Sequence, residues 1–251
     1  MTTPSFATPV VAVASGKGGV GKSSIALTLA RALTGSGLRV GLVDADVYGP
    51  DIPRMVGLRR DVPAKSLRIV DFTSREPDLE AVEIDGIQIA SAGFLLAGTQ
   101  PFAAGTDFAE LLLARLITRT RWEDRQLLVV DLPPGTNDLG RALPRMAERV
   151  AVLLVVTPAE VSHLDSHRLV TVLERFEIPI LGGVENMAHL SCPHCTCRID
   201  LHPPTPSDRT IWSRGITKLT SVPYRPGATP APTDLDAVTG AVRDYLSLNG
   251  R

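Results

Sequence analysis

Several features that are common in proteins are scarce in this sequence of 251 residues. Aromatic residues make up 4% of the chain, and the formal net charge is only -1. A balance this close to neutral disfavours a general role in binding nucleic acid or anionic lipid. Apolar runs such as Val150–Val156 are far too short to span a bilayer, and no positively charged segment precedes the first one. We therefore expect a cytoplasmic protein without a membrane or nucleic-acid partner.

Cysteine is equally scarce, and its spacing is informative. The chain has three cysteines, Cys192, Cys195 and Cys197, all within six residues. They lie too close together for a conventional disulfide framework, which is also unexpected in the cytoplasm. This cluster instead favours metal binding or redox chemistry.

The apolar segments predict an α/β fold. Continuous apolar runs are typical of parallel strands that are covered on both faces, and segments with helical spacing lie between them. The predicted strands cover residues 10–14, 40–43, 127–130, 150–156 and 178–184, and the predicted helices cover residues 23–33, 109–117, 161–176 and 235–246. We expect a single domain over residues 1–251, a doubly wound and mostly parallel sheet with helices on both faces. Ligands of such a sheet bind beyond the carboxyl ends of its strands.

The stretch SGKGGVGKSS contains a phosphate-binding loop. Gly16 to Ser23 fits G-x-x-x-x-G-K-[ST], directly between a predicted strand and a predicted helix. In this motif Lys22 reaches the β- and γ-phosphates of ATP, and the Ser23 hydroxyl holds Mg²⁺. The predicted nucleotide-binding residues of the loop are Gly16, Lys17, Gly18, Gly19, Val20, Gly21, Lys22, Ser23 and Ser24.

Acidic residues follow two of the predicted strands. Asp131 ends the run LLVVD, where a carboxylate is placed to bind Mg²⁺ through a coordinated water, although an aspartate at a strand end also serves to cap a loop. Asp44 and Asp46 follow another strand, and Asp46 is suited to orienting an attacking water. Asp44 is a candidate for supporting the structure of the loop instead of acting on the nucleotide. Asp51 is a candidate cap of the helix that follows.

The loop has a second lysine, Lys17, which the phosphate motif does not require. A second cation near the phosphates neutralises charge that develops during phosphoryl transfer. K-G-G-x-G-K-[ST] is the deviant Walker A pattern, and with it the chain resembles the MinD/ParA/Mrp class of P-loop ATPases. The resemblance implies that Lys17 acts on the phosphates of a partner chain in a homodimer, and that Asp46 is the switch aspartate. The alternative is that Lys17 is merely a solvated surface residue.

Four further sequence blocks restrict the resemblance to one family within this class. These are GLVDADVYGPDIPRMVGL, VVDLPPGTNDL, VTPAE and GGVENMAHLSCPHC, and together they look like the Mrp/ApbC family of iron-sulfur cluster carrier ATPases. The resemblance implies that Asn186 contacts adenine and that apo iron-sulfur proteins accept a cluster. Cys192 and Cys195 supply two thiolates, too few for a four-cysteine [4Fe-4S] site, so a symmetric dimer would complete the site. The family holds a bridging cluster in this way. The resemblance therefore implies an inserted metal-binding C-x-x-C segment near residues 186–200 of this chain.

Other interpretations remain open from the sequence. His189 and His194 lie near the cysteines and allow a zinc site. His163 and His167 have two-histidine metal spacing on a helix, but a solvated surface is the favoured interpretation. The competing functions are a MinD- or ParA-like dimerisation switch without a cluster and an ATPase dimer that is clamped together by zinc. Three features depart from the family pattern, namely Cys197, residues 101–110 and residues 196–219.

Overall fold

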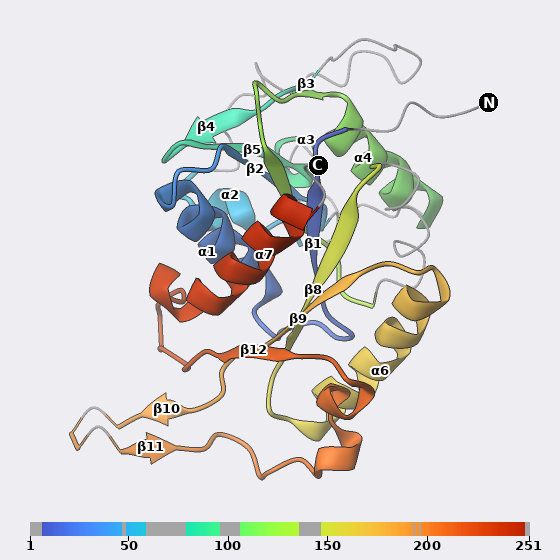
Figure 1. Cartoon of the computed structure of the whole chain (residues 1–251). Helices are drawn as coiled ribbons and strands as arrows, with labels where there is room; N and C mark the ends of the chain where they lie inside the picture. Colours follow the sequence, from blue (N-terminus) through green and yellow to red (C-terminus); the bar gives the residue numbers. More distant parts are fainter. Residues whose placement is uncertain are drawn as a thin grey trace.

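The computed structural model describes residues 7–46, 49–58, 79–95, 106–135, 147–192, 194–195 and 197–248. Within them, an eight-stranded sheet has the order β12-β9-β8-β1-β7-β2-β5-β4 (Figure 1). All neighbouring strands are parallel except β4, which pairs antiparallel with β5. The strands are β1 (Val10–Ala14), β2 (Val40–Asp44), β4 (Val82–Ile84), β5 (Ile87–Ser91), β7 (Leu127–Asp131), β8 (Val150–Val156), β9 (Ile180–Glu185) and β12 (Lys218–Ser221).

Helices cover both faces of this sheet (Figure 1). Alternate residues of a strand point to opposite faces, so β1 contributes to two cores. Val11 and Val13 pack in the core that contains α1 and α7, whereas Val10 and Ala12 pack in the core of α4 and α6. The helices are α1 (Lys22–Gly35), α2 (Ile52–Met55), α3 (Ala92–Leu95), α4 (Thr106–Thr118), α6 (Glu160–Arg175) and α7 (Asp236–Leu248), with 3-10 turns η1 (Ser207–Arg209), η2 (Ile211–Arg214) and η3 (Pro232–Leu235).

Two short strand pairs lie outside the main sheet. β3 (Leu79–Glu80) pairs parallel with β6 (Thr120–Arg121), and β10 (Leu190–Ser191) pairs antiparallel with β11 (Arg198–Ile199). The hairpin of β10 and β11 extends away from the body of the protein, beyond the end of β9 (Figure 1). It contains the C-x-x-C segment, so the cysteines are carried on a projecting element.

The predicted doubly wound α/β fold is confirmed, since the five predicted strands and four predicted helices all form. The atypical segment at residues 101–110 lies partly outside the described residues, and α4 begins at Thr106. Among the described residues, no helix combines the length and the apolar composition needed to cross a membrane.

The interpretation of His163 as a solvated surface residue is wrong. His163 is only 1% exposed, because the 3-10 turn η2, which follows the hairpin in the chain, packs over this part of α6. The His163 and Trp212 rings make a T-shaped contact at a centroid distance of 5.6 Å. Trp122 and Trp212 both pack against the core.

Candidate functional site

The phosphate loop connects β1 to α1 at the carboxyl edge of the sheet. Gly19 and Gly21 have φ angles of 79° and 81°, a left-handed conformation that glycine adopts without steric cost. Gly21 is the residue that caps α1, so the N-terminus of the helix faces the loop and its dipole favours an anion there. The loop encloses a cavity of about 210 Å³ lined by Ser15, Lys17, Gly18, Gly19, Val20, Gly21, Lys22, Ser23, Ser24, Asp46, Gly49, Asp51, Met55 and Pro134. Gly16 is absent from this lining.

Gly16 instead makes the closest backbone approach in the loop. A Cβ atom at this position would lie 2.3 Å from the carbonyl carbon of Asp165 and 2.4 Å from the nitrogen of Ser166, both in α6. The Gly16 N–H also donates a hydrogen bond to the Ser166 hydroxyl at 3.3 Å. The first glycine of the motif therefore lets the loop rest directly on the backbone of α6.

Lys22 and Asp131 form a buried ion pair beneath the loop. The Nζ of Lys22 donates to Oδ1 of Asp131 at 2.9 Å, and the side chains are 7% and 1% exposed. Burial raises the pKa of Asp131, and the Lys22 charge opposes that rise. The loop lysine is thus held by the carboxylate that ends β7.

The donor set beside this pair fits Mg²⁺. Oδ2 of Asp131 is buried and has no hydrogen-bond partner among the described residues. The Ser23 hydroxyl, at the start of α1, also helps to hold down the pKa of this carboxyl. A hydroxyl and a carboxylate oxygen are hard ligands of the kind that Mg²⁺ prefers, and Mg²⁺ at such a site keeps several waters. The two residues predicted to manage Mg²⁺ are therefore brought together.

Asp44 is a buried acid that supports the loop between β2 and α2. Its carboxylate accepts hydrogen bonds from the Ser91 hydroxyl at 2.8 Å and from the Ile52 and Asp46 N–H groups at 3.3 Å. Asp44 lies opposite Asp131 in the register of β2 and β7, and it is fully buried. Burial and the nearby charge of Asp131 raise the pKa of Asp44 to about 8. These contacts agree with the predicted role of Asp44 in supporting the loop.

Asp46 and Lys17 lie on the cavity itself. Oδ1 of Asp46 accepts a hydrogen bond from the Gly49 N–H at 3.0 Å, which fixes the carboxylate beside the loop. Lys17 is exposed, and the Ser15 hydroxyl donates to its carbonyl oxygen at 2.9 Å. Asp51 occupies the N-cap position of α2, but its side chain makes no capping hydrogen bond.

Asn186 lies beneath the phosphate loop. The side chain is 4% exposed, and its Nδ2 donates to the Val20 carbonyl oxygen at 2.8 Å. A Cβ atom on Gly21 would come within 2.3 Å of the same nitrogen, so the glycine is what lets Asn186 approach. Its predicted contact with adenine stays a prediction. The observed contact instead links the end of β9 to the loop.

The three cysteines lie at the tip of the β10–β11 hairpin. None forms a disulfide, and Cys192 is half-buried whereas Cys195 and Cys197 are exposed. The Cys192 N–H donates to the Cys197 carbonyl oxygen at 2.9 Å, which continues the hairpin pairing. The described part of one chain contains no group of three or more histidine, cysteine or acidic side chains arranged to hold a metal. The C-x-x-C motif of a single chain supplies two thiols.

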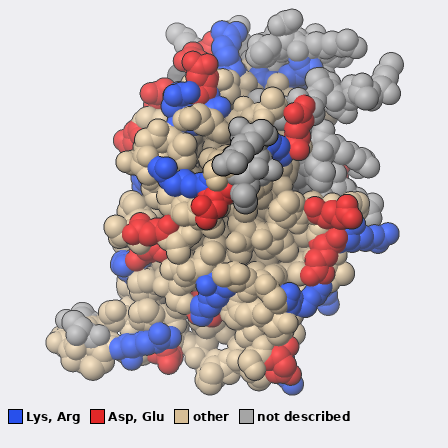
Figure 2. All heavy atoms as spheres, in the orientation of Figure 1, with Lys and Arg blue, Asp and Glu red and all other residues tan. Residues whose placement is uncertain are grey.

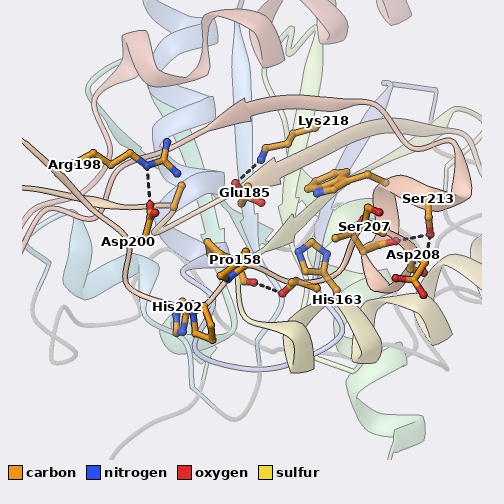
Figure 3. A pocket seen from close by; sticks show the side chains of 16 residues that line it. Pro158, His163, Glu185, Arg198, Asp200, His202, Ser207, Asp208, Ser213 and Lys218 are labelled. Atoms are coloured by element: carbon orange, nitrogen blue, oxygen red, sulfur yellow. Dashed lines mark hydrogen bonds and ion pairs between the residues drawn. The ribbon is translucent and has the colours of Figure 1, made fainter.

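A second cavity, of about 720 Å³, lies between α6, β12 and the segment after β11 (Figure 3). Two ion pairs line it, Lys218 with Glu185 and Arg198 with Asp200. His163 also lines it and accepts a hydrogen bond on Nδ1 from the Ile211 N–H, and burial lowers its pKa. No described residue lines both this cavity and the phosphate-loop cavity. Sequence patterns did not indicate this cavity, because residues far apart in the chain form it.

The distribution of surface charge is mixed. Figure 2 shows lysine and arginine side chains interspersed with aspartate and glutamate over the face that it draws. Several of the charges are paired, such as Arg209 with Glu160 and Arg225 with Asp234. The described residues of this face therefore present no continuous field of one sign.

Comparisons with known proteins agree with this geometry. A family model described as ParA, NUBPL iron-transfer P-loop NTPase, matches residues 7–240. The iron-sulfur cluster carrier protein of Pyrococcus furiosus is 31% identical over 215 residues, which are 85% of this chain and 73% of that protein. The protein of the same name from Escherichia coli strain K12 is 36% identical over 186 residues, 74% of this chain, and the match spans only 48% of its length.

Solved structures show the same fold. The nucleotide-binding protein of Archaeoglobus fulgidus, in complex with ADP, superposes with a TM-score of 0.68 at 29% identity, over 94% of this chain and 88% of that one. The cell division ATPase MinD of Pyrococcus furiosus superposes with a TM-score of 0.63 at 19% identity, over 94% and 98% of the two chains. This chain therefore belongs to the ParA family, as a P-loop NTPase of the NUBPL iron-transfer type.

Proposed function

We propose that this protein is a cytoplasmic ATPase that carries an iron-sulfur cluster and transfers it to apo iron-sulfur proteins. Residues 1–251 form one P-loop ATPase domain, and the segment near residues 186–200 is its inserted metal-binding element. Nucleic acid and membrane are not its partners. The competing proposal, a nucleotide switch without a cluster, provides no role for the paired thiols of the hairpin.

The nucleotide part of the proposal assigns a task to each residue of the cavity. The loop amides and Lys22 hold the phosphates of ATP, and Lys22 exchanges its contact with Asp131 for one with phosphate. Ser23 and Asp131 hold Mg²⁺, which when bound neutralises charge on the phosphate oxygens. Asp46 orients the attacking water, and Asn186 contacts adenine.

The dimer completes both sites. Lys17 of each chain reaches the phosphates held by the other chain, as its exposed position on the loop allows. Cys192 and Cys195 of each chain supply two thiolates, so two chains together hold one [4Fe-4S] cluster as cargo. ATP hydrolysis is tied to the association of the two chains and therefore to the transfer of the cluster.

One observation carries the proposal. The phosphate loop follows the carboxyl end of β1, and the hairpin follows the carboxyl end of β9, two parallel strands of the same sheet. Both sites are therefore anchored at one edge of the molecule. Asn186, the first residue after β9, is hydrogen-bonded to the loop at Val20. An ATPase whose nucleotide loop touches the base of a thiol-bearing hairpin suits a nucleotide-controlled carrier.

The first test is anaerobic reconstitution of the full chain with iron and sulfide, followed by metal analysis, visible absorption and the mass of the dimer. We expect about four irons per dimer for the wild type. A double variant with Cys192→Ser and Cys195→Ser should lose them. Ser191→Ala, an exposed change in the same hairpin without a thiol, is the matched control and should keep them. Zinc in place of iron, or no metal with ATP-dependent dimerisation intact, would contradict the proposal.

A further inference from the structure

The hairpin register sets Cys192 against Cys197 and not against Cys195, its partner in the C-x-x-C motif. Leu190 pairs with Ile199 and Ser191 pairs with Arg198, in antiparallel register. The next pair along the hairpin is Cys192 with Cys197, and the hydrogen bond from the Cys192 N–H to the Cys197 carbonyl oxygen confirms it. Directly opposite residues of an antiparallel pair carry their side chains on the same face. Both thiols therefore share one face of the hairpin.

The spacing of such a pair suits a covalent link. Hydrogen-bonded partners in antiparallel strands have Cα atoms about 5.5 Å apart, and disulfides form at Cα separations of about 4.4 to 6.8 Å. Both residues are thiols in the structure, and Cys197 is exposed to solvent. Cys195 lies in the turn at the hairpin tip, outside the strand pairing. The backbone of the hairpin thus already brings Cys192 and Cys197 together.

We propose that Cys192 and Cys197 are a modification site, at which glutathione disulfide or a related small disulfide closes a reversible Cys192–Cys197 bond. The Cys192 and Cys197 thiols lose two protons and two electrons and form one S–S bond. The disulfide reagent gains them, its own S–S bond breaks, and two thiol molecules are released. Exchange proceeds by thiolate attack through a mixed disulfide, so the exposed Cys197 is the thiol that the reagent reaches first.

The consequence for the cargo rests on the proposed function. A Cys192 that is bonded to Cys197 has no thiolate to offer, so each chain keeps only one thiol of its C-x-x-C pair. A dimer of oxidised chains then has two ligands where a four-cysteine cluster needs four. Oxidation therefore prevents the dimer from binding a cluster, and reduction by excess thiol restores cluster binding.

The pairing is tested on the full chain without metal, equilibrated anaerobically in buffers of reduced and oxidised glutathione. Thiols are alkylated with one reagent, the disulfide is then reduced, and the new thiols are alkylated with a second reagent. Trypsin leaves all three cysteines in the peptide of residues 176–198, whose fragmentation locates each label. We expect the first label on Cys195 and the second on Cys192 and Cys197. A Cys192–Cys195 disulfide, or no disulfide at any ratio of the two glutathione forms, would overturn the proposal.

Cys197→Ser and Cys195→Ser are the matched variants. Cys195→Ser should still form the disulfide, and Cys197→Ser should not. In reconstitution, oxidised wild-type protein should take up at least about tenfold less iron than reduced protein, whereas Cys197→Ser should load equally with and without the oxidant. Loss of iron from reduced Cys197→Ser would make Cys197 a ligand and would refute its role as a switch. Because the labels are read without metal, a failure of the cluster proposal leaves the pairing result intact.

Discussion

Asp44 gives the sharpest physical prediction, which concerns its replacement by asparagine. The side chain is fully buried and lies opposite Asp131 at the ends of β2 and β7. Its pKa is raised to about 8, because burial and the neighbouring charge disfavour the ionised form. Asparagine has nearly the same shape but carries no titrating proton, so Asp44→Asn removes this one source of pH dependence.

The sign and size of the effect follow from linkage. An ordinary pKa of 3.8 in the unfolded chain and about 8 in the folded chain means that folding takes up a proton between those values. The stabilisation is fully present below pH 3.8 and is lost as the pH rises through 8. At 1.36 kcal/mol per pKa unit, the whole range corresponds to about 6 kcal/mol. Between pH 5 and pH 8, about 4 kcal/mol of it is lost.

The assay is urea unfolding of the nucleotide-free chain at several pH values from about 5 to 8, with wild type and variant side by side. The two carboxyl oxygens of Asp44 accept hydrogen bonds from the Ile52 and Asp46 N–H groups, whereas asparagine offers only one carbonyl oxygen. The donor left without an acceptor destabilises the variant by a roughly constant 1 to 3 kcal/mol. As the pH rises from 5 to 8, the unfolding free energy of Asp44→Asn should therefore increase relative to that of the wild type by about 1.4 kcal/mol per pH unit. Parallel pH profiles for the two proteins would refute a raised pKa at Asp44.

Two further predictions concern the phosphate loop. Gly16→Ala should destabilise the protein by about 1 to 3 kcal/mol, because its Cβ would meet the α6 backbone at 2.3 Å. Gly18→Ala, whose Cβ would lie 3.8 Å from Pro134, is the control, and equal unfolding free energies for the two variants would contradict the packing argument. Lys17→Ala should lower ATP hydrolysis by about 10³-fold or more, with ADP affinity by calorimetry unchanged; an unaltered rate would rule out a role for Lys17 in phosphoryl transfer.

The central sheet could be predicted from the sequence because its strands are buried on both faces. The predicted runs at residues 10–14 and 150–156 have the same bounds as β1 and β8. A fully buried strand leaves an unbroken apolar run, and polar or glycine residues mark its ends. The phosphate loop was equally predictable, since its motif lies where a strand passes directly into a helix. Local patterns thus located the loop that we propose binds the nucleotide.

Properties that depend on distant neighbours could not be predicted. His163 has the sequence surroundings of a surface histidine, and it is buried because η2 packs against α6 from about 50 positions further along the chain. The raised pKa of Asp44 requires Asp131 alongside it, which depends on strand order and register. The pairing of Cys192 with Cys197 requires the hairpin register, whereas the motif pairs Cys192 with Cys195. Each of these features arises from packing between segments that are separate in the sequence.

Asn186 illustrates how such packing joins the two halves of the proposed function. Its Nδ2 holds the Val20 carbonyl of the phosphate loop, and its N–H donates to the Val156 carbonyl at 2.7 Å. The next residues are held as well, because the Ala188 N–H donates to the Val222 carbonyl and the Tyr224 N–H donates to the His189 carbonyl. Cys192 lies six positions beyond Asn186, so little unrestrained chain separates the nucleotide loop from the thiols. A change in the loop at Val20 must therefore either break the Asn186 hydrogen bond or move the base of the hairpin. Control of a hairpin-bound cargo by the nucleotide needs this kind of connection.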